Sequence, residues 1–217
     1  MKTELHVRQA GAWPGKGRHI LAQYDDESVI VYQAYRPAIA AHAVAHQQFG
    51  GEFSYSRMSW IKPNFLWMMY RCGWAAKEGQ ERVLAIRLRR PFFDEILRLA
   101  VPSSFDPGRF AQREDWQCAV AGSDVRLQWD PDHDPAGRAL ERRAIQLGLR
   151  GDILRRYGRA ELLSIEDITP FVLEQHARWL ADPVTLQTPA ESVYRPDPAG
   201  AQSAGLDMEP GPAASAG

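Results

Sequence analysis

The chain has little cysteine, no long apolar run and no excess of charge of either sign. Only Cys72 and Cys118 occur among its 217 residues, with neither a CxxC motif nor a zinc-ligand spacing. Free thiols in a reducing compartment are therefore expected, rather than a disulfide framework. No segment approaches the roughly 18 apolar residues that span a membrane, and the first residues lack the apolar core of a signal peptide. These absences predict a soluble, cytoplasmic protein without a membrane partner.

Several common functions lose their support because their motifs are missing. The sequence has no GxGxxG after a strand, no Gly-rich phosphate loop ending in Lys-Ser/Thr, no GxSxG and no HExxH. Most dehydrogenase, ATPase, α/β-hydrolase and zinc-protease hypotheses are thereby weakened. Lys and Arg total 26 against 27 for Asp and Glu, which argues against a globally basic nucleic-acid-binding protein. Both cysteines lie near aromatic residues and are expected in the core rather than as nucleophiles.

The composition of the chain changes near Pro183. From there to Gly217, Pro, Ala, Gly and Ser dominate, and large apolar residues occur only singly. Such a segment buries too little surface to offset its ordering entropy, so residues 183–217 are predicted to be a disordered tail that folding does not need. Residues 1–182 are predicted to form a single globular domain, and they contain no internal repeat.

Within this domain, strands and helices alternate irregularly. The pattern of β-branched and alternating apolar residues predicts strands at 28–35, 82–89, 125–129 and 143–149. Helical spacing, Pro at helix starts and Gly at helix ends predict helices at 37–48, 92–99, 151–157 and 167–180. The order favours an α+β domain, with a mixed or antiparallel sheet flanked by helices, over a doubly wound parallel sheet.

The most unusual segment is the aromatic block that runs from Ser59 to Trp74. Its three tryptophans, seven residues apart, are Trp60, Trp67 and Trp74. Seven residues is close to two helical turns, so the indoles would share one face of a helix that begins near Pro63 and ends at Gly73. Trp67 is expected in the core, and Trp60 or Trp74 beside a cleft. Two interpretations stay open: a core helix that is rich in aromatic residues, or a ligand-binding wall.

The block contains only two charges, Lys62 and Arg71. Each must reach solvent or find a partner, because burying an unpaired charge is costly. If the block is a ligand-binding wall, these two cations would bind an anionic group while the indoles stack on a ring.

Gln146 is the most suggestive single polar residue. Strand alternation places it on one face with Ala144 and Gly148, whereas Ile145 and Leu147 point to the other face. Its small neighbours predict a hollow with an amide at its floor, since Gly within a strand often marks close approach of a ligand. The equal alternative is that a helix covers this face and Gln146 hydrogen-bonds to its backbone.

Arginines are concentrated around the same strand. The group consists of Arg138, Arg142, Arg143, Arg150, Arg155, Arg156 and Arg159. One guanidinium group can donate two hydrogen bonds to the oxygens of a phosphate, so this cluster suits a nucleotide or a nucleic-acid backbone. The commoner outcome for a run of charges is a solvated surface.

Residues 130–135, Asp-Pro-Asp-His-Asp-Pro, have the donor groups of a metal-binding loop. Their spacing matches no EF-hand, and the required glycine is missing. Asp and Pro also form ordinary turns, so a turn is favoured and no metal is expected.

Taken together, the motifs resemble a known family, the domain of unknown function 4291 proteins, over about residues 18–182. The motifs that carry the resemblance are Tyr24-Asp-Asp, Val31-Tyr-Gln-Ala-Tyr35, the stretch from Met58 to Arg71, Gln80-Glu-Arg-Val-Leu-Ala-Ile, Gln128-Trp-Asp-Pro and the stretch from Arg143 to Leu149. They are long and specific, although the family's name implies little about function.

The order of elements is also similar, more weakly, to that of ADP-ribosyltransferases. This resemblance implies a split sheet, NAD as co-substrate and transfer to a nucleotide, nucleic-acid or protein acceptor. Gln146 would fill the late-strand catalytic position, assisted by Tyr35, and stabilise the charge that builds on the ribose. Residues implied to hold NAD are Gln33, Tyr35, Ser59, Trp60, Lys62, Arg71 and Arg143. The usual His-Gly-Thr or Arg-containing opening of that superfamily is missing here.

A non-catalytic hypothesis competes with this one. An aromatic wall beside arginines also describes a pocket for a nucleotide or single-stranded nucleic acid, which stacking and phosphate contacts alone would hold. A third possibility is an interaction module with an aromatic core and no ligand.

Overall fold

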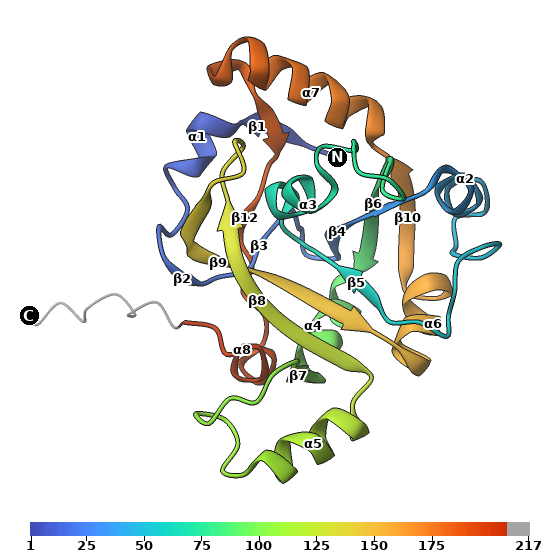
Figure 1. Cartoon of the computed structure of the whole chain (residues 1–217), viewed down its shortest axis with the longest axis vertical. Helices are drawn as coiled ribbons and strands as arrows, with labels where there is room; N and C mark the ends of the chain where they lie inside the picture. The colour runs from blue at the N-terminus through green and yellow to red at the C-terminus, as the bar shows by residue number, and fades with distance from the viewer. Residues whose placement is uncertain (208–217) are drawn as a thin grey trace, which may run out of the picture.

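Two of the predicted strands pair along their full length in a computed structural model that describes residues 1–207. Strand β4 (Ser28–Tyr35) runs antiparallel to β6 (Arg82–Arg89), with Ser28 opposite Arg89 and Tyr35 opposite Arg82. Strand β10 (Leu162–Asp167) pairs with the other edge of β6. These strands form the first sheet, in the order β10-β6-β4 (Figure 1).

The second sheet is built on a long antiparallel pair, β8 (Val125–His133) and β9 (Ala139–Leu149). Strand β7 (Ala100–Pro102) runs parallel to β8, and β2 (Gly17–Arg18) runs parallel to β9. Strand β5 (Ser59–Ile61) pairs antiparallel with the end of β9. The mixed and antiparallel sheets with flanking helices confirm the predicted α+β class.

The two sheets meet at β5. Directly after this strand, the backbones of Lys62 and Tyr32 exchange hydrogen bonds, so the chain leaving β5 contacts β4 of the first sheet. Figure 1 shows β5 crossing between the first sheet and the long β8–β9 pair. Residues 59–62 therefore lie at the seam between the two sheets.

One large hydrophobic cluster joins alternate residues of both sheets. It includes Val31 and Ile86 from the first sheet, Leu127 and Leu147 from the second, and three helices. These helices are α2 (Pro37–His46), α4 (Arg90–Arg98) and α6 (Gly151–Arg159). A second cluster packs the opposite side of β4 and β6 against α3 (Phe65–Cys72) and α7 (Thr169–Ala181). Since the two clusters take alternate residues of β4, both sides of that strand are covered.

Helix α3 is shorter than the aromatic block from which it was predicted. The Asn64 side chain caps it by accepting a hydrogen bond from the Trp67 N–H at 2.7 Å, and Gly73 ends it in the left-handed conformation. Trp60 lies in β5 and Trp74 follows the helix, so the expectation that three indoles share one helical face is wrong. Trp67 lies in the core as predicted, with 6% of its surface exposed.

The prediction that the chain is disordered from Pro183 is wrong for residues 183–207. A 3-10 turn (Pro183–Thr185) leads to β11 (Gln187–Pro189), which pairs with β1 (Thr3–Leu5). Strand β12 (Ser192–Val193) then pairs with β3 (Leu21–Ala22), and α8 (Pro198–Ala204) contacts α4. Single apolar residues anchor this segment, because Leu186 and Tyr194 are almost fully buried. The rest of the predicted tail, 208–217, lies outside the described residues.

Two further helices follow or flank short strands. Helix α1 (His6–Ala10) follows β1, and α5 (Arg113–Gly122) packs beside β7. Neither helix was predicted from the sequence. Within residues 1–207, no helix combines the length and the apolar character needed to cross a membrane.

Candidate functional site

One face of the second sheet carries a polar cluster. Leu127, Ile145 and Leu147 point into the main core, so the residues that alternate with them point to the opposite side, called here the outer face. Gln128 and Gln146 lie directly opposite each other on β8 and β9. With Asp130 they form the outer-face cluster, and all three side chains are half-buried.

The two glutamines hold the carboxylate of Asp130 from both sides. Gln128 Nε2 donates to Asp130 Oδ1 at 3.0 Å, and Gln146 Nε2 donates to Asp130 Oδ2 at 2.7 Å. Two amide donors on separate strands fix the plane of the carboxylate while leaving its remaining acceptor positions free. Gln146 is thus bound to a side chain, rather than to the backbone of a covering helix.

Lys62 lies on the same side of the seam. Ile61 points into the main core, so Trp60 and Lys62 on either side of it point to the outer face. Lys62 is only 4% exposed, and no described residue forms a hydrogen bond or ion pair with its ammonium group. The pKa of Lys62 is lowered to about 8, mainly by burial and next by the positive charge of Arg71, while Asp130 and Cys72 act in the opposite direction.

Trp60 fills the space that was predicted to be a hollow. A Cβ on Gly148 would lie 2.6 Å from Met58 Sδ and 3.0 Å from the Trp60 ring. Gly148 is therefore required because the indole and the thioether pack against its backbone, and not because the strand face is empty. Trp60 itself is half-buried beside the outer-face cluster, and Arg71 is exposed on the last turn of α3.

Gln33, Tyr35 and Ser59 form a separate network on the inner side of β5. Tyr157 Oη donates to Gln33 Oε1 at 2.6 Å, Gln33 Nε2 donates to Ser59 Oγ at 2.8 Å, and the Tyr35 and Ser59 hydroxyls lie 3.0 Å apart. Burial raises the pKa of the Tyr35 phenol. These satisfied bonds join β4, β5 and α6, so the network ties the two sheets together.

The predicted site residues therefore divide between two sides of β5. Tyr35 and Ser59 lie on the inner side and border a polar depression of about 360 Å³, together with Arg57. Trp60 and Gln146 lie on the outer face. Tyr35 and Gln146 therefore lie on opposite sides of the sheets, because successive residues of β5 point to opposite sides.

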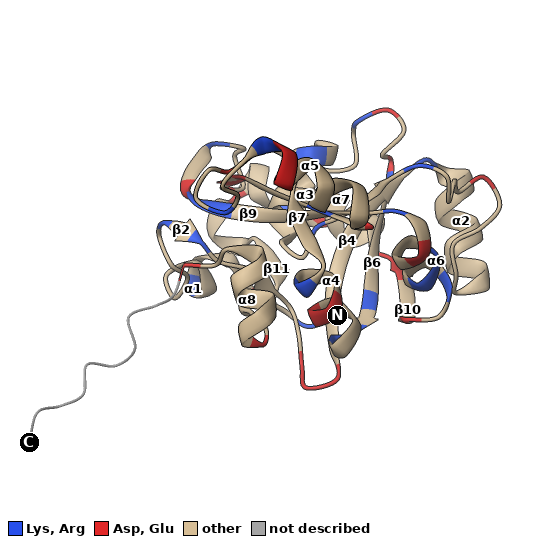
Figure 2. Ribbon diagram, turned by 90° about the horizontal axis from the view of Figure 1, so that it is seen from below, with Lys and Arg blue, Asp and Glu red and all other residues tan. Residues whose placement is uncertain are grey.

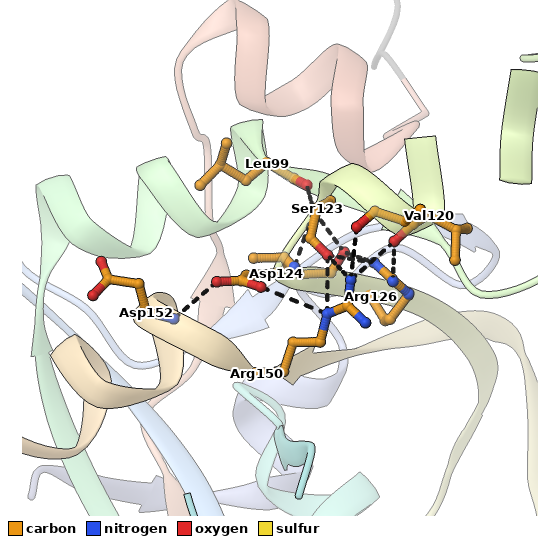
Figure 3. A network of polar contacts seen from close by, with 9 residues as sticks. Leu99, Val120, Ser123, Asp124, Arg126, Arg150 and Asp152 are labelled. Carbon is orange, nitrogen blue, oxygen red and sulfur yellow. Dashed lines mark hydrogen bonds and ion pairs between the residues drawn. The ribbon is translucent and has the colours of Figure 1, made fainter. Parts of the chain in front are cut away.

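The arginines that cluster in sequence are dispersed in the fold. Arg126 and Arg150 hydrogen-bond to the carbonyl groups of residues 120–123 at the end of α5 (Figure 3). Arg142 forms a buried ion pair with Asp132 at 2.6 Å, and Arg156 binds Glu95. Figure 2 shows basic residues spread over many elements together with acidic ones. Arg143 is exposed on β9.

Residues 130–135 do not form the predicted turn. Strand β8 continues to His133, where the imidazole stacks on the Tyr70 ring with centroids 3.5 Å apart, and the turn follows at residues 134–137. Within residues 1–207, no group of three or more His, Cys, Asp or Glu side chains is arranged to hold a metal. Cys72 is buried as expected, but Cys118 is exposed on α5, contrary to its predicted place in the core.

Comparison with known proteins identifies the family. The model of a family described as a domain of unknown function (DUF4291) matches residues 19–194, more than half of the chain. The chain belongs to this family. Among curated proteins, none matches it.

The extent of the family match bears on the choice of site. It includes the outer-face cluster, Lys62, Trp60 and Arg71. A cavity of about 590 Å³ lies elsewhere, between α8 and the segment around Ile20. Its wall includes Gln202 and Leu206, beyond the end of the match, and none of the predicted site residues. The outer face is therefore the better candidate for a function shared by the family.

Asp130 is the site residue that sequence reasoning missed. The strand was predicted to end at Trp129, so Asp130 was assigned to a loop. If the predicted strand had been extended to Asp130, the alternation would have shown this residue. Gln128 and Asp130 alternate with Leu127 and Trp129 and so share the polar face.

Proposed function

We propose that this member of the family binds a nucleotide, with NAD as the foremost candidate, on the outer face and cleaves its N-glycosidic bond. The observation that carries the proposal is the Asp130 carboxylate, which two amides orient on the same face of the sheet as the buried Lys62. Gln146 alone lacks the negative charge that such a reaction uses. Asp130 supplies that charge 2.7 Å from the Gln146 amide.

The chemistry follows from where charge develops. As the bond between nicotinamide and ribose breaks, positive charge builds on the ribose, and a fixed carboxylate stabilises it most in the transition state. Gln128 and Gln146 act as positioning residues, since they hold the carboxylate in one orientation. Burial on the sheet surface strengthens the interaction because less water screens it.

Two further side chains have the chemistry to bind the nucleotide. The half-buried Trp60 ring offers a surface on which a base or nicotinamide ring stacks, and the exposed Arg71 guanidinium suits a phosphate group. Tyr35, Gln33 and Ser59 are assigned a structural role instead, because their polar groups are satisfied by one another and by Tyr157.

The test is release of nicotinamide from NAD by the wild-type protein and by Asp130→Asn. This substitution keeps the shape and removes the charge, so nicotinamide release should fall by about 100-fold or more. Asp26→Asn is the matched control, because the Asp26 side chain is fully exposed. Absence of release by the wild type, or full activity of Asp130→Asn, would contradict the proposed reaction.

A second candidate is binding of a nucleotide or single-stranded nucleic acid without chemistry. The combination of a half-buried indole and an exposed guanidinium favours it, because stacking and phosphate contacts suffice for such binding. The two candidates differ in a simple measurement. Salt-sensitive binding of oligonucleotides that Trp60→Ala abolishes, with no release of nicotinamide, would favour the second.

A further inference from the structure

Lys62 differs from every other lysine of the protein. The chain has four lysines, and Lys2, Lys16 and Lys77 are all exposed. Only 4% of the surface of Lys62 is exposed. A buried ammonium group normally has an anionic partner, because its desolvation is costly. Here no carboxylate of the described chain lies within ion-pair distance of it.

The surroundings of Lys62 provide what a reactive amine needs. Asp130 and Arg71 are close enough to act on the Lys62 charge in opposite directions. Asp130 can exchange protons with a reacting group, and Arg71 can bind an anionic substituent. Lysines that react with carbonyl compounds are characteristically desolvated or subject to the field of another cation, and Lys62 is buried and has its pKa lowered by Arg71.

We propose that the Lys62 amine forms an imine with the aldehyde carbon of a ribose phosphate, the C1 atom that N-glycosidic cleavage sets free. This inference deepens the proposed function and rests on it for the identity of the sugar. The outer face would then hold the ribosyl product covalently, on the same side of the sheet as the Asp130 carboxylate. The substrate class is an open-chain sugar aldehyde that carries a phosphate group.

The step balances without an oxidant or a reductant. The neutral Lys62 amine adds to C1, a C–N bond forms, and the carbonyl oxygen takes up the proton that the nitrogen loses, which gives a carbinolamine. A proton from solvent then converts its hydroxyl group to water, which leaves as the C=N bond forms, and the nitrogen returns a proton to solvent to give the neutral imine. Water reverses both steps and releases the sugar. The lowered pKa of Lys62 supports the first step, because a substantial fraction of the amine is neutral near pH 7.5.

The experiment traps the imine with a reductant. Wild-type protein is incubated with ribose 5-phosphate and sodium cyanoborohydride at pH 7.5, digested, and mapped by mass spectrometry. The exposed lysines are internal controls for unspecific glycation, and Lys62 should be modified on the order of ten times faster than Lys77. Modification of Lys77 with Lys62 unmodified would overturn the proposal, as would equal modification of all four lysines.

Two comparisons test the assigned surroundings. Ribose without phosphate should label Lys62 more slowly than ribose 5-phosphate, and Arg71→Met should remove that difference. Asp130→Asn should slow the labelling of Lys62 and leave Lys77 unchanged. If phosphate and Asp130 both prove irrelevant to the rate, the site is not built for this ligand and the proposal fails.

This test is separate from that of the proposed function. Ribose 5-phosphate already has a free C1, so trapping needs no cleavage of an N-glycosidic bond. Labelling of Lys62 without release of nicotinamide would refute the cleavage of NAD and retain the amine site. Release of nicotinamide without labelling of Lys62 would support the cleavage of NAD and refute the amine site.

Discussion

The Gln146 amide donates a hydrogen bond to the carboxylate of Asp130 across neighbouring strands, with 2.7 Å between Nε2 and Oδ2. This pair changes the role expected of the glutamine. An amide in place of a carboxylate lacks the charge that stabilises a ribosyl cation, but an amide that orients a carboxylate serves the same reaction indirectly. Gln146 is therefore treated as a positioning residue and Asp130 as the catalytic candidate.

Gln146→Ala should reduce turnover much more than substrate binding. Removing the amide frees one oxygen of Asp130, so the carboxylate samples other orientations, and the loss falls mainly on the transition state. The fold should survive, because the side chain is only half-buried and alanine adds no bulk. The measurements are kcat and KM for nicotinamide release, together with the melting temperature.

Gln48→Ala is the matched control, because Gln48 is exposed after α2. Gln128→Ala should resemble Gln146→Ala, since it frees the other oxygen of Asp130. A large drop in the melting temperature of Gln146→Ala would mean that the amide is structural, and unchanged turnover would remove it from the site.

The sequence predicted the strands that carry strong local signals. Residues 28–35 and 82–89 form strands with the predicted bounds, because β-branched and alternating apolar residues leave little choice of conformation or face. Strand β10 and helix α5 were missed. Helix α5 has no buried residue, and so it lacks the apolar periodicity that reveals a helix.

Long-range pairings could not be predicted from the sequence. The bond from Gln146 to Asp130 depends on the register of β8 and β9, which no local pattern encodes. The arginines were grouped because they are close in sequence, but strand alternation and separate helices direct them to different carboxylates and carbonyl groups. The ordered C-terminal segment could not be predicted from composition either. A few isolated buried residues hold it in place, and they hardly change the average composition of the segment.

Truncation after Asp182 should destabilise the protein severely. It removes the buried Leu186 and Tyr194, whose burial contributes roughly 1.5–3 kcal/mol each, and the Tyr194 hydrogen bond to Asp94 at 2.6 Å. It also removes Glu191, which accepts the Phe65 N–H at the start of α3 at 2.6 Å. Because total stability is about 5–15 kcal/mol, such losses should appear as insolubility or a much lower melting temperature.

Truncation after Asp207 is the matched control, since it retains every described residue. Its melting temperature should equal that of the full chain. If the protein truncated after Asp182 melted like the full chain, the packing of residues 183–207 would contribute nothing to stability.

Trp67→Ala should cost about 3–5 kcal/mol of unfolding free energy, the range for removing a large buried side chain. The indole stacks on the rings of Tyr70, also on α3, and of His133 on β8. The ring centroids are 5.5 Å and 5.3 Å away, respectively. Tyr70→Ala should cost less, because Tyr70 is 48% exposed. Urea unfolding of both variants measures the difference, and equal losses would place Trp67 outside the core.

The burial of Lys62 should make stability rise with pH in a defined window. The pKa of Lys62 is about 8 in the folded protein and 10.5 in its ordinary state. Well below pH 8 the lysine is protonated in both states, so the folded protein carries the full cost of the buried charge. Between pH 8 and 10.5 the unfolded chain binds the proton and the folded protein does not. Stability increases with pH wherever the unfolded chain binds more protons.

Lys62→Met removes this term, so the unfolding free energies of the wild type and the variant should converge as the pH rises. The difference between the two pKa values corresponds to about 3 kcal/mol. The unfolding free energy of the variant minus that of the wild type should therefore be larger by this amount below pH 8 than at pH 10.5. Urea unfolding at pH 7, 8, 9 and 10 measures it, and subtracting the two curves cancels the other titrating groups. Lys77→Met, at an exposed position, should give a flat difference. A flat difference for Lys62→Met as well would show that the Lys62 ammonium is solvated in the folded protein, and the reactive amine assigned to the outer face would lose its physical basis.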